Sequence, residues 1–297
     1  MEICITGVSG FVGRFLSGFL VKKGHRVTGV DRNPPGSFSD SPFFRFIEAD
    51  TTVKGDWLDH IGRAEAVVNL TGVNIFARWT ENRKAVIYKS RILSTRNVAS
   101  AVSPGAVLLS TSAAGIYGNR GDEVLTESAL PGDDFLAKVC VDWEAEAGRA
   151  AEKGARVAIA RLGVVLGRDG GALAKMATPF RLFLGGPLGD GRHWMPWIHL
   201  IDLARAMEFL ILNHKLSGPF NCCAPGQATN REFVCALGSA LRRPAVFPMP
   251  AFFLKLLLGE LGGFLLYSQR VVPERLLDAG FEFSFPEIRS AMADIYS

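Results

Sequence analysis

"ITGVSGFVGRF", residues 5–15, places Gly7, Gly10 and Gly13 between two apolar runs near the start of the 297-residue chain. The first run predicts a short buried strand, and the second predicts a helix. Between them, Gly7 allows a tight turn, Gly10 lets the backbone approach a pyrophosphate, and Gly13 lets helix and strand pack closely. The free N–H groups at the start of such a helix attract an anion. The stretch therefore predicts a dinucleotide-binding turn, with a glycine-rich turn that holds no ligand as the alternative.

The second predicted strand, residues 26–30, leads into two residues of opposite charge. Asp31 follows Gly13 by 18 residues, close to the offset of roughly 20 residues at which a carboxylate binds the adenosine ribose. Arg32 favours instead the additional phosphate of NADP. NAD and NADP therefore remain open alternatives, and two solvated charges in a turn before Pro34 are a third interpretation.

Strand and helix patterns alternate along the first half of the chain. Six stretches have the apolar pattern of short buried strands: 2–6, 26–30, 43–49, 64–70, 106–111 and 156–161. Helices are predicted at 11–23, about 80–102 and 135–153, the last with Asp133 or Asp134 as N-cap and Gly154 as C-cap. This alternation predicts an α/β fold with a doubly wound parallel sheet, whose ligands bind at the carboxyl ends of the strands.

After about residue 162 the pattern changes to glycine-rich loops and shorter helices. We expect a Rossmann domain over residues 1–161, which also receives part of 195–222, and a smaller substrate-binding lobe over 162–297. The apolar stretch at 251–266 is shorter than the roughly 20 residues that cross a bilayer. It predicts a core-facing helix, with a helix bound to a membrane surface as the rarer alternative.

The composition is that of an ordinary globular protein, with 48% hydrophobic and 21% charged residues. The net charge of +4 is spread along the chain without basic runs among aromatics, so it favours a small anionic ligand over nucleic acid. Five cysteines without a C-x-x-C pair argue against disulfides and zinc, and they indicate a reducing cytoplasm. No metal, membrane partner or secretory signal is expected. The oligomeric state is open, with a homodimer among the alternatives.

"TGVSGFVG" resembles the T-G-x-x-G-x-x-G motif of the extended short-chain dehydrogenase/reductases, the epimerase and dehydratase group. Further matches follow in the group's order: Asp50, "NLTG" (69–72), "STSAAGIYG" (110–118), "RLGVVLG" (161–167) and "WIHLIDLARA" (197–206). More narrowly, "RWTENRKAVIYKSRI", "LGGPLGDGRHWMPWIH" and "SGPFN" are similar to an atypical branch described as sugar-nucleotide epimerases with a family-specific C-terminal helical segment. The resemblance covers nearly the whole chain.

The resemblance implies an NAD(P)(H) cofactor and a set of residues around it. The implied cofactor contacts are Thr6, Gly7, Gly10, Phe11, Val12, Gly13, Asp31, Arg32, Asp50, Asn69, Leu70, Thr71, Gly72, Ser110 and Arg161. Ser112 is implied to bind the substrate oxygen near the nicotinamide. Its loop is one residue longer than the common pattern, so Ser110 and Thr111 are alternatives for that role.

The chain departs from the group at its proton relay. Most members use Y-x-x-x-K, in which the lysine lowers the pKa of a tyrosine that exchanges a proton with the substrate. None of the four tyrosines here has a lysine four residues later, and Leu136 and Cys140 take the two positions. Lys138 faces about 200° away from Cys140 around the helix. The usual relay is absent, and Cys140 is either a reactive thiol or a small buried residue.

Tyr117 and a cluster at residues 192–194 are further candidates for a catalytic or binding role. Tyr117 follows the fifth strand and is a candidate general acid if Arg161 lowers its pKa; a tyrosine packed in its loop is the alternative. Arg192, His193 and Trp194 offer a cation, a titratable ring and an aromatic surface suited to a sugar or a nucleotide phosphate. Packing within their loop is the alternative.

Together these features predict an NAD(P)-dependent oxidoreductase or epimerase-like enzyme. Its expected substrate is a small polar carbonyl or alcohol, with nucleotide sugars among the candidates. The missing relay motivates the alternative of a non-catalytic NAD(P)-binding protein with a regulatory or redox-sensing role. His199 and Asp202 resemble a motif that closes the small lobe against the cofactor domain, so we expect them to be structural.

Overall fold

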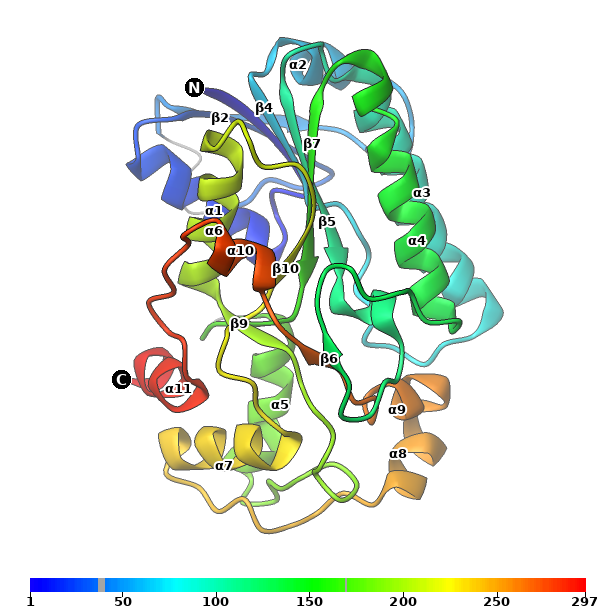
Figure 1. Cartoon of the computed structure of the whole chain (residues 1–297), viewed down its shortest axis with the longest axis vertical. Coiled ribbons are helices and arrows are strands. Elements are labelled where there is room, and N and C mark those ends of the chain that lie inside the picture. The colour runs from blue at the N-terminus through cyan, green and yellow to red at the C-terminus, as the bar shows by residue number, and fades with distance from the viewer. Residues whose placement is uncertain (37–40, 169) are drawn as a thin grey trace.

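A seven-stranded parallel sheet forms the centre of the molecule, with strand order β10-β7-β5-β4-β1-β2-β3 (Figure 1). The structure is a computed structural model and describes residues 1–36, 41–168 and 170–297. The strands of the sheet are β1 (Glu2–Thr6), β2 (Arg26–Asp31), β3 (Phe44–Glu48), β4 (Ala66–Asn69), β5 (Val107–Ala113), β7 (Arg156–Leu162) and β10 (Gly218–Cys222). Two short pairs lie outside it: β6 (Val124–Leu125) with β11 (Arg270–Val271), and β8 (Val164–Leu166) with β9 (Trp197–His199).

Helices cover both faces of the sheet, which confirms the doubly wound fold. One face packs against α1 (Phe11–Lys22) and α6 (Leu200–Leu212), and the other against α2 (Trp57–Arg63), α3 (Glu81–Ala101) and α4 (Phe135–Gly148). The later helices are α5 (Gly171–Arg181), α7 (Asn230–Leu241), α8 (Ala251–Leu258), α9 (Glu260–Phe264), α10 (Glu274–Asp278) and α11 (Ile288–Tyr296), and 3-10 turns span η1 (Ala114–Tyr117) and η2 (Ala151–Lys153).

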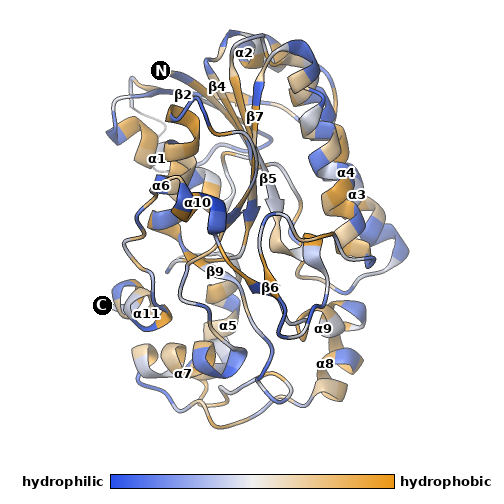
Figure 2. Cartoon of the chain, in the orientation of Figure 1, coloured by the Kyte–Doolittle hydropathy of each residue, from blue (hydrophilic) through white to orange (hydrophobic). Residues whose placement is uncertain are grey.

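The apolar strand sequences follow from burial on both faces. Along β1, Ile3 and Ile5 pack in the core under α1 and α6, whereas Cys4 packs in the core under α2 and α3. Side chains of a strand alternate between faces, so a strand covered on both sides is apolar at nearly every position. Figure 2 shows the resulting apolar centre of the sheet beneath helices with mixed surfaces.

The predicted strands and the first two predicted helices are confirmed within a few residues. In the third, Asp134 rather than Asp133 is the N-cap, because its carboxylate accepts hydrogen bonds from the N–H groups of Leu136 and Ala137. This helix ends at Gly148, and η2 continues the chain to Gly154, whose φ of +85° is left-handed. The seven-residue α2 was not predicted.

The prediction of one core-facing helix over 251–266 is wrong. Gly259, with φ of +61°, separates α8 from α9, and Leu254 is the buried residue of α8. Phe252 and Leu256 are 67% and 70% exposed. The helix breaks after two turns, and the two pieces pack against each other instead of forming one helix on the core. Their contact is close, because a Cβ at Gly262 of α9 would lie only 2.2 Å from the Leu254 carbonyl oxygen of α8. Within the described residues, no helix is long and apolar enough to cross a membrane.

The C-terminal segment returns to the sheet domain. Leu276 and Phe281 belong to the core cluster under α1 and α6. Asp202 of α6 accepts hydrogen bonds of 2.8 Å from the N–H groups of Ser284 and Phe285. The sheet receives β10, which lies within the stretch expected to join it, and a domain boundary at residue 161 stays a prediction.

Candidate functional site

The three glycines of the first turn have different structural roles. Gly7 adopts φ of +74°, and a Cβ there would lie 2.8 Å from the carbonyl carbon of Leu70. A Cβ at Gly13 would lie 2.3 Å from the Gly7 oxygen. At Gly10 the nearest atom is that same oxygen at 3.2 Å, and Gly10 lines a cavity. Gly7 and Gly13 therefore allow the turn to close, whereas Gly10 keeps space open in front of it.

That cavity, of about 370 Å³, lies at the carboxyl ends of β1, β2 and β4. Eight predicted cofactor residues line it: Gly7, Gly10, Asp31, Arg32, Asp50, Leu70, Thr71 and Gly72. Lys89 and Ser90 of α3 line it as well. No motif singled out Lys89, because the helix was predicted but not the face that it turns toward the sheet.

Both carboxylates of this cavity accept hydrogen bonds from nearby loops. Asp31 accepts from the N–H of Ser9 at 3.0 Å and from the N–H of Arg32 at 2.8 Å. Asp50 accepts from the hydroxyl and the N–H of Thr52, and these bonds lower the pKa of Asp50. The exposed Arg32 side chain makes no ion pair within 4.0 Å among the described residues. Its guanidinium is therefore available to an anion.

Three predicted cofactor residues form a buried network behind the cavity. Thr6 donates a hydrogen bond to the Asn69 side-chain oxygen at 2.8 Å. The Asn69 amide donates to Thr95 at 2.7 Å and to Ser110 at 3.3 Å. Thr6, Asn69 and Ser110 are buried and absent from the cavity lining. They connect β1, β4 and β5, and so support the cavity without facing it.

A second cavity, of about 410 Å³, shares Leu70 and Gly72 with the first. Its other predicted cofactor residues are Phe11 and Val12. Its wall is largely apolar and includes Ile75, Phe76, Leu136, Val139, Cys140, Trp143, Val164, Val165, Trp194, Met195, Phe264 and Leu265. Polar side chains enter from Arg91, Thr111, Ser112, Tyr267 and Gln269.

Ser112 is the candidate hydroxyl with free hydrogen-bonding capacity in this cavity. Its Oγ is buried beside the Cys140 thiol, a weak hydrogen-bonding group, and meets no further partner within the part of the chain that the structure describes. Thr111 also lines the cavity, but its hydroxyl donates to the Asn69 carbonyl at 2.9 Å. Ser110 lies outside the lining. A thiol satisfies a buried hydroxyl only weakly, so Ser112 has hydrogen-bonding capacity left for a molecule bound in this cavity.

The positions of the missing relay do lie at the second cavity. Leu136 and Cys140 of α4 both line it, whereas Lys138 is exposed to solvent. Burial raises the pKa of the Cys140 thiol to about 11. The thiol is therefore neutral near pH 7, as expected of a small buried residue and not of a nucleophile.

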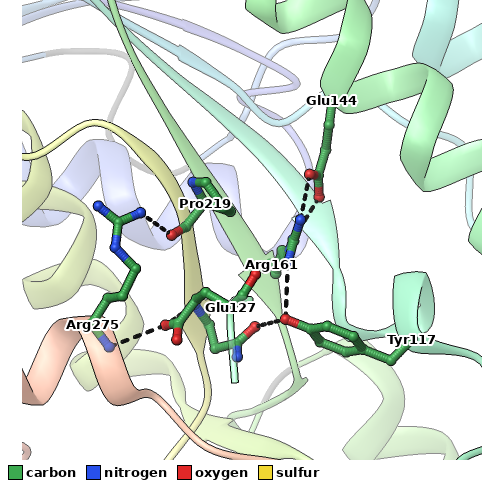
Figure 3. Close-up of polar contacts among 7 residues, drawn as sticks. Tyr117, Glu127, Glu144, Arg161, Pro219 and Arg275 are labelled. Carbon is green, nitrogen blue, oxygen red and sulfur yellow. Dashed lines mark hydrogen bonds and ion pairs between the residues drawn. The ribbon is translucent and has the colours of Figure 1, made fainter. Parts of the chain in front are cut away.

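Tyr117 lines neither cavity and is held instead by polar contacts with Arg161 (Figure 3). Its hydroxyl donates to the Asn221 side-chain oxygen at 2.7 Å and accepts from Arg161 at 3.0 Å. Burial raises the pKa of Tyr117 to about 12, although Arg161 acts in the opposite direction. The lowered pKa on which its role as a general acid depended is therefore not found.

Arg161 belongs to the same network and is likewise absent from both cavity linings. Its guanidinium makes two bonds of 2.8 Å to the Glu144 carboxylate and donates to the Glu127 carbonyl at 3.1 Å (Figure 3). Asn221 continues the network by donating to the Val272 carbonyl at 2.9 Å. The sequence analysis placed Arg161 near Tyr117 but did not find Glu144, Glu127 and Asn221, through which the network connects β7 to α4, β10 and the C-terminal segment.

Of the predicted substrate residues, Trp194 lines the cavity. Its indole N–H donates to Asp122 at 2.8 Å, and the Arg270 guanidinium lies 4.7 Å from its ring centre. Arg192 and His193 lie outside the cavity lining; Arg192 is exposed, and burial lowers the pKa of the His193 imidazole.

Comparison with known proteins shows the family of the chain. The model of the NAD dependent epimerase/dehydratase family matches residues 3–223. The chain belongs to this family. A domain of unknown function, DUF1731, matches residues 249–295, the C-terminal helical segment. Family membership confirms the predicted resemblance and the nicotinamide dinucleotide cofactor.

Relatives of this epimerase/dehydratase family match over nearly the full chain. The chain is 38% identical to the chloroplastic epimerase family protein SDR39U1 homolog of Arabidopsis thaliana, over 99% of this chain and 86% of that protein. It is 34% identical to the epimerase family protein YfhF of Bacillus subtilis, over 99% and 98% of the two chains.

Solved structures show the same fold. The crystal structure of the human epimerase family protein SDR39U1 (isoform 2) with NADPH is 33% identical, with a TM-score of 0.86 over 100% of this chain and 99% of that one. The UDP-glucose 4-epimerase of Thermus thermophilus, in complex with NAD, has a TM-score of 0.78 at 19% identity, over 100% and 99% of the chains. The second likeness concerns the fold alone.

Proposed function

We propose that this protein binds NADP(H) in the cavity beside the glycine turn and uses it to oxidise or reduce a small molecule in the neighbouring cavity. The observation that carries the proposal is the junction of the two cavities at Leu70 and Gly72. One cavity has a glycine turn and charged groups, and the other has the Ser112 hydroxyl, whose neighbour is the weakly bonding Cys140 thiol. The bound NADPH of the human relative supports the choice of coenzyme.

The residues of the first cavity fit a dinucleotide. α1 begins after Gly10 without a side-chain cap and without an acidic residue in its first turn, so its first N–H groups are free to bind a pyrophosphate. Arg32 and Lys89 provide two cations on the lining, whereas Asp31 already accepts two backbone hydrogen bonds. This balance favours the extra phosphate of NADP over the ribose hydroxyls of NAD.

A nicotinamide in this position exchanges a hydride with a carbonyl or alcohol carbon. Ser112 donates a hydrogen bond to the substrate oxygen in our proposal. Water supplies or accepts the accompanying proton, because the Tyr117 hydroxyl is engaged with Asn221 and Arg161, and Leu136 and Cys140 replace the usual relay. Epimerisation and a nucleotide-sugar substrate stay predictions.

The second candidate function is coenzyme binding without turnover, with a regulatory or redox-sensing role. The same substitution of Leu136 and Cys140 for the relay favours it. The two candidates differ in one measurable respect, which is coenzyme-dependent turnover that requires Ser112.

The first experiment titrates the protein with NADPH and with NADH, following nicotinamide fluorescence and thermal stabilisation. We expect NADPH to bind more tightly, and Gly10→Val to abolish binding. A valine at position 10 places its side chain in the cavity, because Gly10 lines that cavity. Its Cβ would also lie 3.2 Å from the Gly7 oxygen. If neither coenzyme binds the wild-type protein, the proposal is wrong.

The second experiment measures NADPH oxidation with a panel of carbonyl compounds, for the wild type and Ser112→Ala. Turnover that falls roughly 100-fold or more in Ser112→Ala supports the enzyme, because removal of one oxyanion donor typically has an effect of that size. Tight NADPH binding without turnover across the panel supports the non-catalytic candidate instead.

A further inference from the structure

The wall of the second cavity contains a guanidinium, that of Arg91 on α3. Arg91 donates hydrogen bonds to the carbonyls of Ile87 at 3.1 Å and Val73 at 3.2 Å. Its Cζ atom lies 5.2 Å from the ring centre of Trp143. Two carbonyls and one aromatic face therefore fix the orientation of the side chain, although it is long and intrinsically flexible.

Arg91 lacks a carboxylate counter-charge within the described part of the chain. No ion pair of 4.0 Å or less involves it there. Burial lowers its pKa, and no carboxylate acts against that effect. Arg161, by contrast, is neutralised by two bonds to Glu144. A largely buried cation without a counter-charge is costly. The binding of an anion beside Arg91 would remove this cost and would therefore be favourable.

The position of Arg91 limits what that anion is attached to. Among the described residues of the cavity lining, Arg91 carries the one formal charge, and the surrounding wall is apolar and aromatic. A Cβ at Gly72 would lie 3.1 Å from the Arg91 Cζ atom, so the guanidinium lies against the junction with the coenzyme cavity. Ser112 lines the same cavity.

We propose that Arg91 binds a carboxylate of the substrate, and that the substrate is a monoanion with an apolar or aromatic body and a carbonyl or alcohol group. One cation matches one negative charge. Two of the five N–H donors of the guanidinium are used by the carbonyls, and the remaining donors suit the two oxygens of a carboxylate. The inference deepens the proposed function, on which the redox step depends, and it favours a monoanion over a nucleotide diphosphate in this cavity.

The test measures binding by calorimetry, with and without NADPH, so that it does not depend on turnover. Two matched pairs of probes differ only in charge: 4-carboxybenzaldehyde against 4-carbamoylbenzaldehyde, and phenylpyruvate against its amide. We expect at least one carboxylate to bind tenfold or more tightly than its amide. Arg91→Met should remove this preference, and Arg91→Lys should retain part of it.

The control is Arg96→Met, because Arg96 lies on the same helix and pairs with Glu146 outside the cavity. It should keep the preference for the carboxylate. Thermal unfolding and NADPH affinity of each variant show that the fold and the coenzyme cavity are intact.

Equal binding of carboxylates and amides to the wild type overturns the inference, as does a failure of every probe to bind. A loss of NADPH affinity in Arg91→Met as large as the loss of carboxylate affinity also overturns it, because Arg91 would then serve the coenzyme. Failure of the proposed function has a different signature: the wild type would not bind NADPH, while the carboxylate preference without coenzyme would still be measured.

Discussion

Asp31 and Arg32 lie side by side at the end of β2, and their surroundings distinguish them. The Asp31 carboxylate is occupied by the backbone of Ser9 and Arg32, whereas the Arg32 side chain is exposed at the cavity. Neighbouring residues of opposite charge can thus differ in what they offer a ligand, because backbone donors satisfy one and not the other.

Arg32→Ala should weaken NADPH binding by about 10- to 100-fold, since a hydrogen bond to a charged group contributes roughly 1.5–3 kcal/mol. NADH binding should change little. Fluorescence titration of both coenzymes checks this, with Arg149→Ala on the end of α4 as a control outside the cavity. Equal losses for NADPH and NADH would assign Arg32 to a part that the two coenzymes share.

His199 makes stability depend on pH. Its Nδ1 caps α6 by accepting from the N–H of Ile201 at 3.1 Å, which requires a neutral imidazole acceptor. Burial lowers the pKa of His199, although Asp294 raises it in part. The unfolded chain, with a histidine pKa of about 6.5, therefore binds a proton first on acidification, and stability is lost below that pH.

His199→Asn keeps a side-chain acceptor at the cap but removes the titrating group. Its melting temperature should fall less than that of the wild type as the pH is lowered through 6.5. Buried His193, whose pKa burial also lowers, contributes a residual slope of the same sign. Parallel melting curves of both proteins against pH would contradict the assignment to His199.

Sequence motifs located the residues of the site but not the directions of their side chains. Gly7, Asp31, Asp50 and Thr71 line the coenzyme cavity because strand ends and tight turns fix their positions. Asn69 belongs to the same motif as Thr71, yet it points into the sheet to bind Thr95. The strand β4 ends at Asn69, so the regular alternation of side chains does not extend to Thr71, and the neighbouring elements determine where each polar group finds its partner.

At the scale of elements, the first turn depends on the absence of one Cβ where α1 crosses β1. Gly13→Ala places a methyl group 2.3 Å from the Gly7 carbonyl oxygen. This oxygen belongs to the backbone of the turn and cannot move aside as a flexible side chain could. We expect a destabilisation of about 1–3 kcal/mol or more, as in an overpacked core. Urea unfolding measures it.

Gly148→Ala is the matched control, because it is also a helical glycine and a Cβ there meets nothing within 4 Å. It should leave stability unchanged or raise it by up to about 1 kcal/mol, as helix propensity predicts. A similar destabilisation by both substitutions would show that helix position, and not the contact with Gly7, decides the effect.

Element prediction succeeded where the pattern was long and failed where it was short or purely apolar. α3, with 21 residues, was predicted nearly to its ends, whereas the seven-residue α2 offers too few turns for a clear period. The segment of α8 and α9 is apolar except for Lys255 and Glu260, so its composition alone predicted burial. The positive φ of Gly259, which a sequence pattern does not reveal, divides it.

At the scale of the whole molecule, residues near the C-terminus complete the core under α1 and α6. Leu276 and Leu277 are neighbours on α10, and they are 0% and 46% exposed. Leu276→Ala should destabilise the entire fold by about 2–5 kcal/mol, because the leucine packs with α1 and α6. Leu277→Ala should change stability by less than about 0.5 kcal/mol.

Equilibrium unfolding followed by tryptophan fluorescence and by far-ultraviolet circular dichroism checks this pair. The two signals should move together in Leu276→Ala, because a single core is affected. An early separate transition in that variant would instead show that the C-terminal segment unfolds on its own.

The residues that line the two cavities are also synthesised at different times. The lining of the coenzyme cavity ends at Ser90, whereas the substrate cavity needs Phe264, Leu265, Tyr267 and Gln269. During synthesis on the ribosome, N-terminal parts of a chain become available to fold first. The residues that hold the coenzyme therefore emerge long before those that enclose the substrate. A nascent or prematurely terminated chain that lacks these last residues lacks part of the wall of the second cavity, and it also lacks Leu276, which completes the core under α1 and α6.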